Sequence, residues 1–255
     1  MRFLAFLAVL ALLGCAQPAP VRPLDPLPLG AVEPAPAPDP AADHRRELAA
    51  LGVDFAPPRR GKAILVNVPA FEAIAYEDGL PVFRSRVIVG KPATPTPILD
   101  TATSVVRFRP TWRPTPAMIA TGAYEDRVYA PGRQNPLGLA AIRLEPGMLV
   151  YLHDTNQRRL FDRERRALSW GCVRVEKWDR MAAWVLDATP EQVTAWAEGR
   201  RTFDAHTEGV PVYLRYYTRF PDAEGVVVEH PDIYGRDRQM SRQAAASTQG
   251  APAPL

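Results

Sequence analysis

Cysteine and histidine are scarce in this chain, with two and four copies among 255 residues. Two cysteines are too few for a fold stabilised by several disulfides, and the spacing of the Cys and His residues does not match a zinc site. We therefore expect no metal and no cofactor. Internal repeats are absent, and no apolar run is long enough to span a bilayer, which argues against a repeat array or a membrane-spanning bundle.

Long runs of one charge are also missing. The 31 Lys and Arg residues nearly balance the 28 Asp and Glu residues, which leaves a formal net charge of +3. Without a basic run there is no dedicated patch for nucleic acid, so we expect a solvated, slightly basic surface and no nucleic-acid partner. Hydrophobic residues make up 47% of the chain, enough for the packed core of one or two domains.

The first fourteen residues have the pattern of a secretory signal peptide. The apolar run Phe3–Leu13 follows a positive charge and is too short to cross a bilayer. The sequence Leu12-Leu13-Gly14-Cys15 resembles the bacterial lipobox, in which the cysteine becomes the lipidated first residue after cleavage. We expect residues 1–14 to be a lipoprotein signal and Cys15 to carry a membrane anchor; an ordinary signal peptide is the alternative. Ala16, in place of Asp, predicts a periplasmic protein attached to the outer membrane.

The termini of the remaining chain differ in composition from its centre. Residues 15–60 are rich in Pro and Ala, which favours an extended tether, with room for a short helix from Asp43 to Leu51. In that helix Asp43 would be the cap and Gly52 the stop. Residues 61–237 are predicted to form the folded domain. The Gln-, Ala- and Ser-rich tail, residues 238–255, is predicted to be disordered.

Short apolar runs separated by turn residues predict a mixed or mainly antiparallel sheet, so the fold class is mainly β with α. Asp78-Gly79 is a hairpin signal. Helices are predicted over Lys177–Leu186, from its three-to-four spacing of apolar residues, and from Thr189 to Gly199. The predicted strands are Lys62–Val68, Phe71–Tyr76, Pro81–Val89, Ser104–Phe108, Ile142–Leu144, Met148–Leu152 and Val210–Tyr217.

His153 and Cys172 are the candidate catalytic pair. His153 ends an apolar strand, and a polar loop of fifteen residues separates it from Ser169-Trp-Gly171-Cys172-Val-Arg174. Gly171 allows a tight turn before the cysteine. If Cys15 is lipidated, Cys172 has no partner for an internal disulfide and is a candidate reactive thiol. A thiolate beside an imidazole and backbone donors is typical of nucleophilic acyl transfer, whereas a buried structural cysteine is the alternative.

His153, the fifteen-residue gap and Ser169-x-Gly171-Cys172-Val-Arg174 together resemble the signature of the L,D-transpeptidase (YkuD-type) catalytic domain. The similarity covers roughly Gly61 to Asp237 and implies a YkuD-like mixed β-sheet or β-sandwich, with short helices after the catalytic cysteine. Further matching segments are Val66–Phe71, Val89–Pro92, Asn135–Gly138, Leu152–Thr155 and Asp232–Asp237.

The resemblance implies that Cys172 is the nucleophile and His153 the general base and acid. The backbone carbonyl of Asp154 would orient the imidazole, and a triad-like role of its carboxylate or a solvated loop position stays open. The N–H groups around Gly171 and Cys172 would form the oxyanion hole.

Five further residues are candidates for substrate binding, each with a structural alternative. Ser169 is expected to hydrogen-bond within its loop. Trp170 either lines the groove or covers the loop, and Arg174 either binds a carboxylate of the substrate or forms a surface ion pair. Trp112 and Tyr124 either line the groove or are core aromatics. The link between Trp112 and Asn135 lacks the long lid-like insertion of relatives, which predicts a more open site.

The resemblance implies that the substrate is the peptide stem of bacterial peptidoglycan and that the product is a 3→3 cross-link, formed through a thioester at Cys172. An L,D-carboxypeptidase or an amidase, with water in place of the acceptor amine, is the alternative within enzymes. From another class, the chain would be a non-catalytic lipoprotein that binds the wall.

Overall fold

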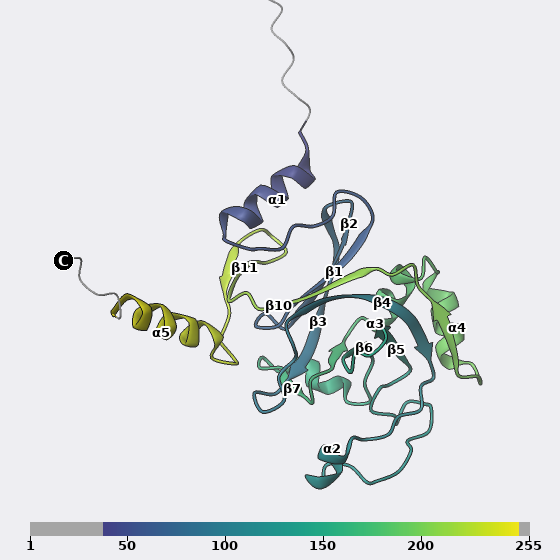
Figure 1. Cartoon of the computed structure of the whole chain (residues 1–255). Coiled ribbons are helices and arrows are strands. Elements are labelled where there is room, and N and C mark those ends of the chain that lie inside the picture. Colours follow the sequence, from purple (N-terminus) through teal and green to yellow (C-terminus); the bar gives the residue numbers. More distant parts are fainter. Residues whose placement is uncertain (1–37, 250–255) are drawn as a thin grey trace, which may run out of the picture. The chain divides into compact units, whose positions relative to one another are not determined.

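The structure, a computed structural model, describes residues 38–249 and is built around a ten-stranded mixed sheet (Figure 1). The strands of this sheet are β1 (Lys62–Asn67), β2 (Glu72–Glu77), β3 (Leu80–Gly90), β4 (Leu99–Phe108), β5 (Ala140–Leu144), β6 (Tyr151–His153), β7 (Ala167–Ser169), β8 (Val173–Val175), β9 (Phe203–His206) and β10 (Pro211–Arg215). A second, two-stranded sheet pairs β11 (Arg219–Pro221) with β12 (Val227–Glu229).

The helices are short, apart from the last. They are α1 (Pro40–Ala50), α2 (Pro116–Ala120), the 3-10 turn η1 (Arg158–Asp162), α3 (Trp178–Val185), α4 (Pro190–Glu198) and α5 (Arg236–Gln249). The predicted fold class, mainly β with α, is confirmed. The predicted position of the helices is confirmed as well, because α3 and α4 come after Cys172 in the chain. None of the helices within residues 38–249 combines the length and apolar character that crossing a membrane requires.

The large sheet closes on itself. Its strand order is β10-β1-β2-β3-β8-β6-β5-β4-β9, β7 pairs with β3, and β10 also pairs with β4. Most neighbours are antiparallel, but β1–β10, β3–β7 and β6–β8 are parallel. The predicted hairpin at Asp78-Gly79 joins β2 to β3, and both residues have the positive φ that such a turn requires.

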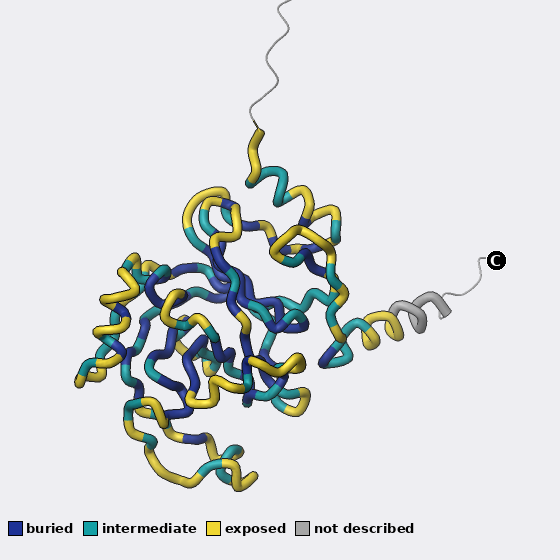
Figure 2. The backbone as a smooth tube through the Cα atoms, turned by 180° about the vertical axis from the view of Figure 1, so that it is seen from behind, coloured by how far each residue is buried: buried dark blue, intermediate teal, exposed yellow. Residues whose placement is uncertain are grey.

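Two apolar clusters stabilise this arrangement. The larger one fills the space between the sheet and helices α3 and α4, with Val106, Met181 and Val193 among its buried members. Helix α4 begins, as predicted, with a capping box in which Thr189 and Gln192 bond each other's backbone N–H groups. Figure 2 shows the central strands buried and the loop around α2 largely exposed.

The smaller cluster contains residues that precede the predicted start of the folded region. Leu48, Val53 and Phe55 are buried against Ile74 and Tyr76, so the domain begins before the predicted boundary at residue 61. These apolar side chains, spaced among prolines, pack as core residues and not as part of a tether.

The capping residue of α1 also differs from the predicted one. The carboxylate of Asp39 accepts from the N–H of Ala42 at 3.0 Å, whereas Asp43 lies in the first turn and pairs with Arg46. Pro40 explains the difference, because proline is favoured at the first helical position and places the cap one residue earlier.

The tail differs from the sequence prediction as well. Helix α5 covers Arg236–Gln249, where disorder was predicted from residue 238. The carboxylate of Asp232 accepts from the N–H groups of Arg236 at 2.8 Å and Arg238 at 3.2 Å, so it satisfies donors at the start of the helix. The predicted signal peptide, Cys15 and the tether up to residue 37 lie outside the described residues and stay predictions.

Candidate active site

The candidate base and the candidate nucleophile come from neighbouring strands. Strands β6 and β8 run parallel, with Leu152 opposite Val173 and His153 opposite Arg174. Because Cys172 directly precedes Val173, this pairing brings the cysteine beside the strand that ends in His153. The imidazole is buried, whereas the cysteine is partly exposed. The strand pairing therefore joins two residues that a polar loop separates in the sequence.

A cleft opens at this point and has an outer and an inner part. The outer part, about 540 Å³, is lined by residues of β4, β5 and the loop around α2, and the inner part is a recess of about 40 Å³. Cys172 lines both parts. The residues around the inner recess are Trp112, Met118, Tyr124, Pro136, Leu137, His153, Ser169, Trp170, Cys172 and Arg174. The structure thus brings seven of the predicted site residues to one recess, and the short link after Trp112 supplies part of its wall.

The imidazole of His153 is held by the backbone. Its Nδ1 pairs with the carbonyl oxygen of Asp154, an arrangement that makes Nδ1 the donor and leaves Nε2 as the acceptor of the neutral ring. Burial, and after it the positive charge of Arg174, lowers the pKa of His153 to about 3, although the carbonyls of Asp154 and Leu137 act in the opposite direction. The ring is therefore neutral at physiological pH.

The carboxylate of Asp154 has a different partner set. One oxygen accepts from the N–H of Leu139 at 2.9 Å and the other from Arg158 at 2.8 Å. A Cβ on Gly138 would lie 2.3 Å from this carboxylate, so the segment passes directly over it. The carboxylate thus fastens the loop that lines the recess, whereas the backbone carbonyl contacts the imidazole; the part that each group plays in catalysis stays a prediction.

The thiol of Cys172 is placed between two backbone groups of the preceding strand segment. It donates a hydrogen bond to the carbonyl of Leu149 at 3.6 Å and accepts one from the backbone N–H of Tyr151. Burial raises the pKa of the thiol, while the Tyr151 N–H and the charge of Arg174 oppose that rise. The described side chains of Cys172 and His153 are not hydrogen-bonded to each other. Because the pKa of the imidazole is lowered and that of the thiol raised, both groups are neutral at rest.

Hydrogen bonds of Ser169 hold the turn before Cys172. Its hydroxyl accepts from the N–H of Gly171 at 3.1 Å and donates to the carbonyl of Cys172 at 2.5 Å, which confirms the predicted bonding within the loop. Gly171 has φ +113°, a conformation that disfavours any residue with a side chain. Because the Gly171 N–H already bonds Ser169, the Cys172 N–H is the remaining candidate donor of the predicted oxyanion hole.

Arg174 is buried in the site, which excludes the surface ion pair. Its guanidinium donates to Gln157 Oε1 at 2.8 Å and bonds the hydroxyl of Tyr124. A direct role in binding a substrate carboxylate stays a prediction.

The aromatic candidates form the wall of the cleft. Trp170 lines both parts of the cleft, and Lys91 Nζ lies 3.5 Å from the centre of its ring. Trp112 packs edge-on against Tyr124, with 4.8 Å between ring centres. All three rings line the recess, so the groove position, and not a sealed core, describes them.

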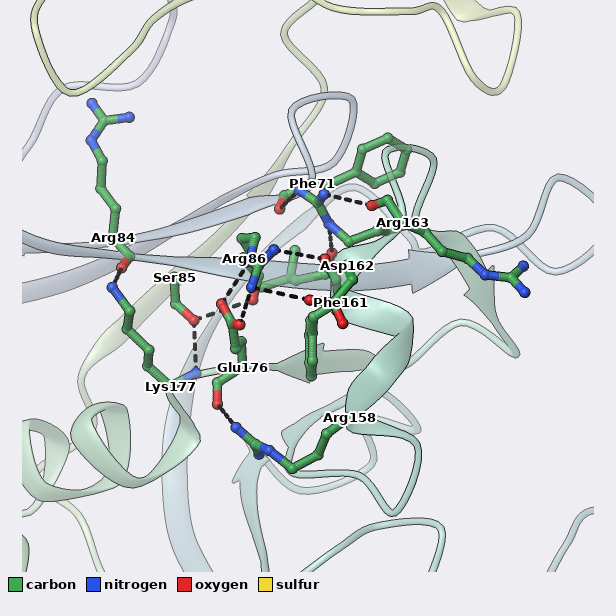
Figure 3. A network of polar contacts seen from close by, with 12 residues as sticks. Phe71, Arg84, Ser85, Arg86, Arg158, Phe161, Asp162, Arg163, Glu176 and Lys177 are labelled. Atoms are coloured by element: carbon green, nitrogen blue, oxygen red, sulfur yellow. Dashed lines mark hydrogen bonds and ion pairs between the residues drawn. The ribbon is translucent and has the colours of Figure 1, made fainter.

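A polar network joins β3 to the loop between His153 and Cys172 and anchors this loop (Figure 3). Arg86 on β3 binds the carboxylate of Glu176 and donates to the carbonyl of Phe161 at 3.0 Å. Arg158 connects this network to the base, because it donates to the carbonyl of Glu176 at 2.7 Å as well as to Asp154.

Sequence reasoning missed Arg143 and Tyr151, which line the outer cleft. Side chains two apart on a strand share a face, so Tyr151 could have been placed beside His153 from the sequence. Arg143 is placed only by the pairing of β5 with β6. Within residues 38–249 no three His, Cys, Asp or Glu side chains are grouped as a metal site would require.

Comparison with known proteins gives one family. The profile of the YkuD L,D-transpeptidase catalytic domain matches residues 61–194. A candidate L,D-transpeptidase of Haemophilus influenzae is 30% identical over 221 residues, which cover 70% of this chain and 45% of that protein. The chain therefore spans less than half the length of this curated relative.

Solved structures with a lower likeness include two L,D-transpeptidases. One is from Enterococcus faecium, with 16% identity, a TM-score of 0.36 and coverage of 61% of this chain and 50% of that chain. The other is from Mycobacterium smegmatis, with 16% identity, a TM-score of 0.35 and coverage of 60% of this chain and 58% of that chain.

Proposed function

The chain belongs to the L,D-transpeptidase catalytic-domain family, and we propose that it forms 3→3 cross-links between peptidoglycan stem peptides through a thioester on Cys172. One observation carries the proposal. Cys172 and His153 line the same recess at the paired ends of β8 and β6, and the carbonyl of Asp154 fixes the imidazole.

In the first half-reaction, Cys172 Sγ attacks the carbonyl on the L-centre of the third, diamino-acid residue of a tetrapeptide stem. The S–C bond forms, and the thiol proton passes to Nε2 of His153. His153 then gives this proton to the nitrogen of the terminal D-alanine as the C–N bond breaks, so the leaving group departs as a neutral amine. The Cys172 N–H stabilises the oxyanion of the intermediate.

In the second half-reaction, the amine on the D-centre of another stem attacks the thioester. The N–C bond forms and the S–C bond breaks, while His153 takes a proton from the amine and returns it to the sulfur. Splitting the exchange in this way avoids direct attack of an amine on an amide.

The resting protonation states suit this sequence. Burial lowers the pKa of the imidazole and raises that of the thiol, so both groups are neutral at rest, and the unprotonated Nε2 can accept the thiol proton. The thiol must first leave the Leu149 carbonyl, to which it donates at rest, and turn toward Nε2.

Mass spectrometry with a purified disaccharide-tetrapeptide tests the proposal. We expect an acyl adduct on Cys172 in the native protein, cross-linked dimers among the products, and neither in Cys172→Ala. Trimmed tripeptides without dimers would instead support the L,D-carboxypeptidase or amidase. Absence of both adduct and products would support a non-catalytic wall-binding protein.

We also propose that the protein is periplasmic and held at the outer membrane by a lipid on Cys15. The lipobox-like sequence that ends in Cys15 supports this, together with Ala16. Metabolic labelling with a fatty-acid analogue should mark the native protein and fail to mark Cys15→Ser, and labelling of that variant would contradict the anchor.

A further inference from the structure

The outer part of the cleft is positively charged. Among the described residues that line it, Arg107, Arg113 and Arg143 are cationic and none is Asp or Glu. Two of these charges are already paired. Arg107 binds both carboxylate oxygens of Asp204 at 2.6 Å, and Arg113 binds Asp126 at 2.7 Å.

Arg143 differs from the other two arginines. Its guanidinium donates no hydrogen bond to any described residue and lies over the ring of Tyr151, with 5.3 Å from Cζ to the ring centre. The positive charge of Arg143 acts on the nearby carboxylate of Asp204, but the hydrogen bonds of that carboxylate are made with Arg107. This contact with the ring keeps the guanidinium in place while its N–H groups stay available to a ligand.

Tyr151 connects Arg143 to the nucleophile. The two residues are opposite each other in the register of β5 and β6, and the backbone N–H of Tyr151 is directed at the sulfur of Cys172. The neighbouring pair in the same register is Ala141 and His153. Arg143 thus occupies the outer cleft one strand away from the residue that holds the sulfur.

We propose that Arg143 is a carboxylate subsite for the amine side of the reaction, and that it binds the α-carboxylate of both the leaving and the entering residue. This inference rests on the proposed function. The terminal D-alanine and the acceptor both carry a carboxylate on the same D-centre as the reacting nitrogen. Because one leaves and the other attacks the same carbonyl carbon, a single bidentate guanidinium can orient both.

A binding measurement tests the donor side without requiring catalysis. In Cys172→Ala, a tetrapeptide with a free terminal carboxylate should bind about 10- to 100-fold more weakly once Arg143→Gln is added, as expected for loss of a charge-assisted hydrogen bond. The matching C-terminal amide should bind equally to both proteins. A matched control is Arg180→Gln, since Arg180 stacks on Phe83 at 4.8 Å outside the cleft and should change neither value.

The acceptor side is tested on the acyl-enzyme of the otherwise native protein. D-alanine should react about 10- to 100-fold more slowly in Arg143→Gln, while D-alaninamide should react at an unchanged rate. The subsite would be overturned if Arg143→Gln weakened the carboxylate compounds and their amides equally. It would also be overturned if the substitution affected neither the tetrapeptide acid nor D-alanine. An effect on the donor alone would overturn the shared role.

Failure of the proposed function has a different signature. In that case the native protein forms no thioester, yet the binding comparison in Cys172→Ala still decides for or against the subsite. Alkylation of Cys172 by iodoacetamide should be equally fast with and without Arg143, because the substitution leaves the thiol and its backbone partners in place. Slower alkylation would mean that Arg143 supports the structure of the site and would overturn the proposal.

Discussion

Arg174 lies opposite His153 in the register of β8 and β6, and its positive charge adds to burial in lowering the pKa of the imidazole. The same charge works against burial at Cys172, where it favours the thiolate. One buried guanidinium therefore disfavours a proton on His153 and on Cys172 alike.

Replacing Arg174 by Gln should move the pH profile of Cys172 alkylation to higher pH, because the thiolate loses a favourable charge. Arg174→Lys keeps the charge and should move the profile less. The measurement is the rate of iodoacetamide labelling of the peptide that contains Cys172, as a function of pH. An unchanged profile in Arg174→Gln would show that the guanidinium does not tune the thiol.

The buried imidazole predicts a loss of stability in acid. The folded-state pKa of His153 is lowered to about 3, so the unfolded chain binds the proton more readily as the pH falls below its ordinary value near 6.5. Between these two values His153 should lower the free energy of unfolding by about 1.4 kcal/mol per pH unit. Urea unfolding of His153→Gln across this window should show a correspondingly shallower decline. Parallel curves for the two proteins would contradict the buried neutral ring.

Two substitutions of Asp154 separate a loop-fastening carboxylate from a triad carboxylate. Asp154→Asn keeps an acceptor for the Leu139 N–H and the carbonyl for His153, so acylation should stay within about tenfold of the native rate. A triad carboxylate would lose about 10⁴-fold. Asp154→Ala leaves that N–H without its partner and should cost about 1–3 kcal/mol in the free energy of unfolding. Single-turnover kinetics and chemical denaturation provide the two readouts.

Gly138 and Gly122 form a matched pair for the close approach to Asp154. Both have positive φ, +66° and +73°, but a Cβ on Gly122 meets nothing within 4 Å. Gly122→Ala should cost only the backbone strain, about 1–2 kcal/mol. Gly138→Ala adds overpacking against the carboxylate, about 1–3 kcal/mol more, and should also slow acylation. Equal losses of stability in the two variants would argue against the close approach.

The position of the folded boundary can be tested by truncation. A chain that begins at Gly61 loses the buried Leu48, Val53 and Phe55, and its free energy of unfolding should fall by on the order of 5 kcal/mol relative to one that begins at Asp39. Equilibrium denaturation of both chains provides the comparison. Equal stability would restore the boundary at residue 61.

Local signals in the sequence were sufficient for much of the fold. The turn at Asp78-Gly79 and the capping threonine of α4 depend on residues close together in the chain, so both were predicted correctly. Strand β9 was missed because Phe203–His206 is only half-buried and gains its strand form from pairing with β4. Helix α1 was predicted, but nothing local showed that Leu48 packs against Ile74.

The candidate site shows the same division. The motif around Cys172 identified the residues that meet in the recess, because their order along the chain resembles a known pattern. The two functions of Asp154 could not be separated in this way, since only the fold shows which group faces His153. Arg143 carries no motif, and its position depends on the pairing of β5 with β6.

Strand pairing between β6 and β8, and not the length of the connecting loop, sets the separation of the imidazole and the sulfur. The exposed stretch Arg163–Arg165 lies on that loop and away from the residues that line the recess. Chains with the same pair of strands can therefore lengthen or shorten this stretch and keep the chemistry. A search for relatives that requires a fifteen-residue gap would overlook them.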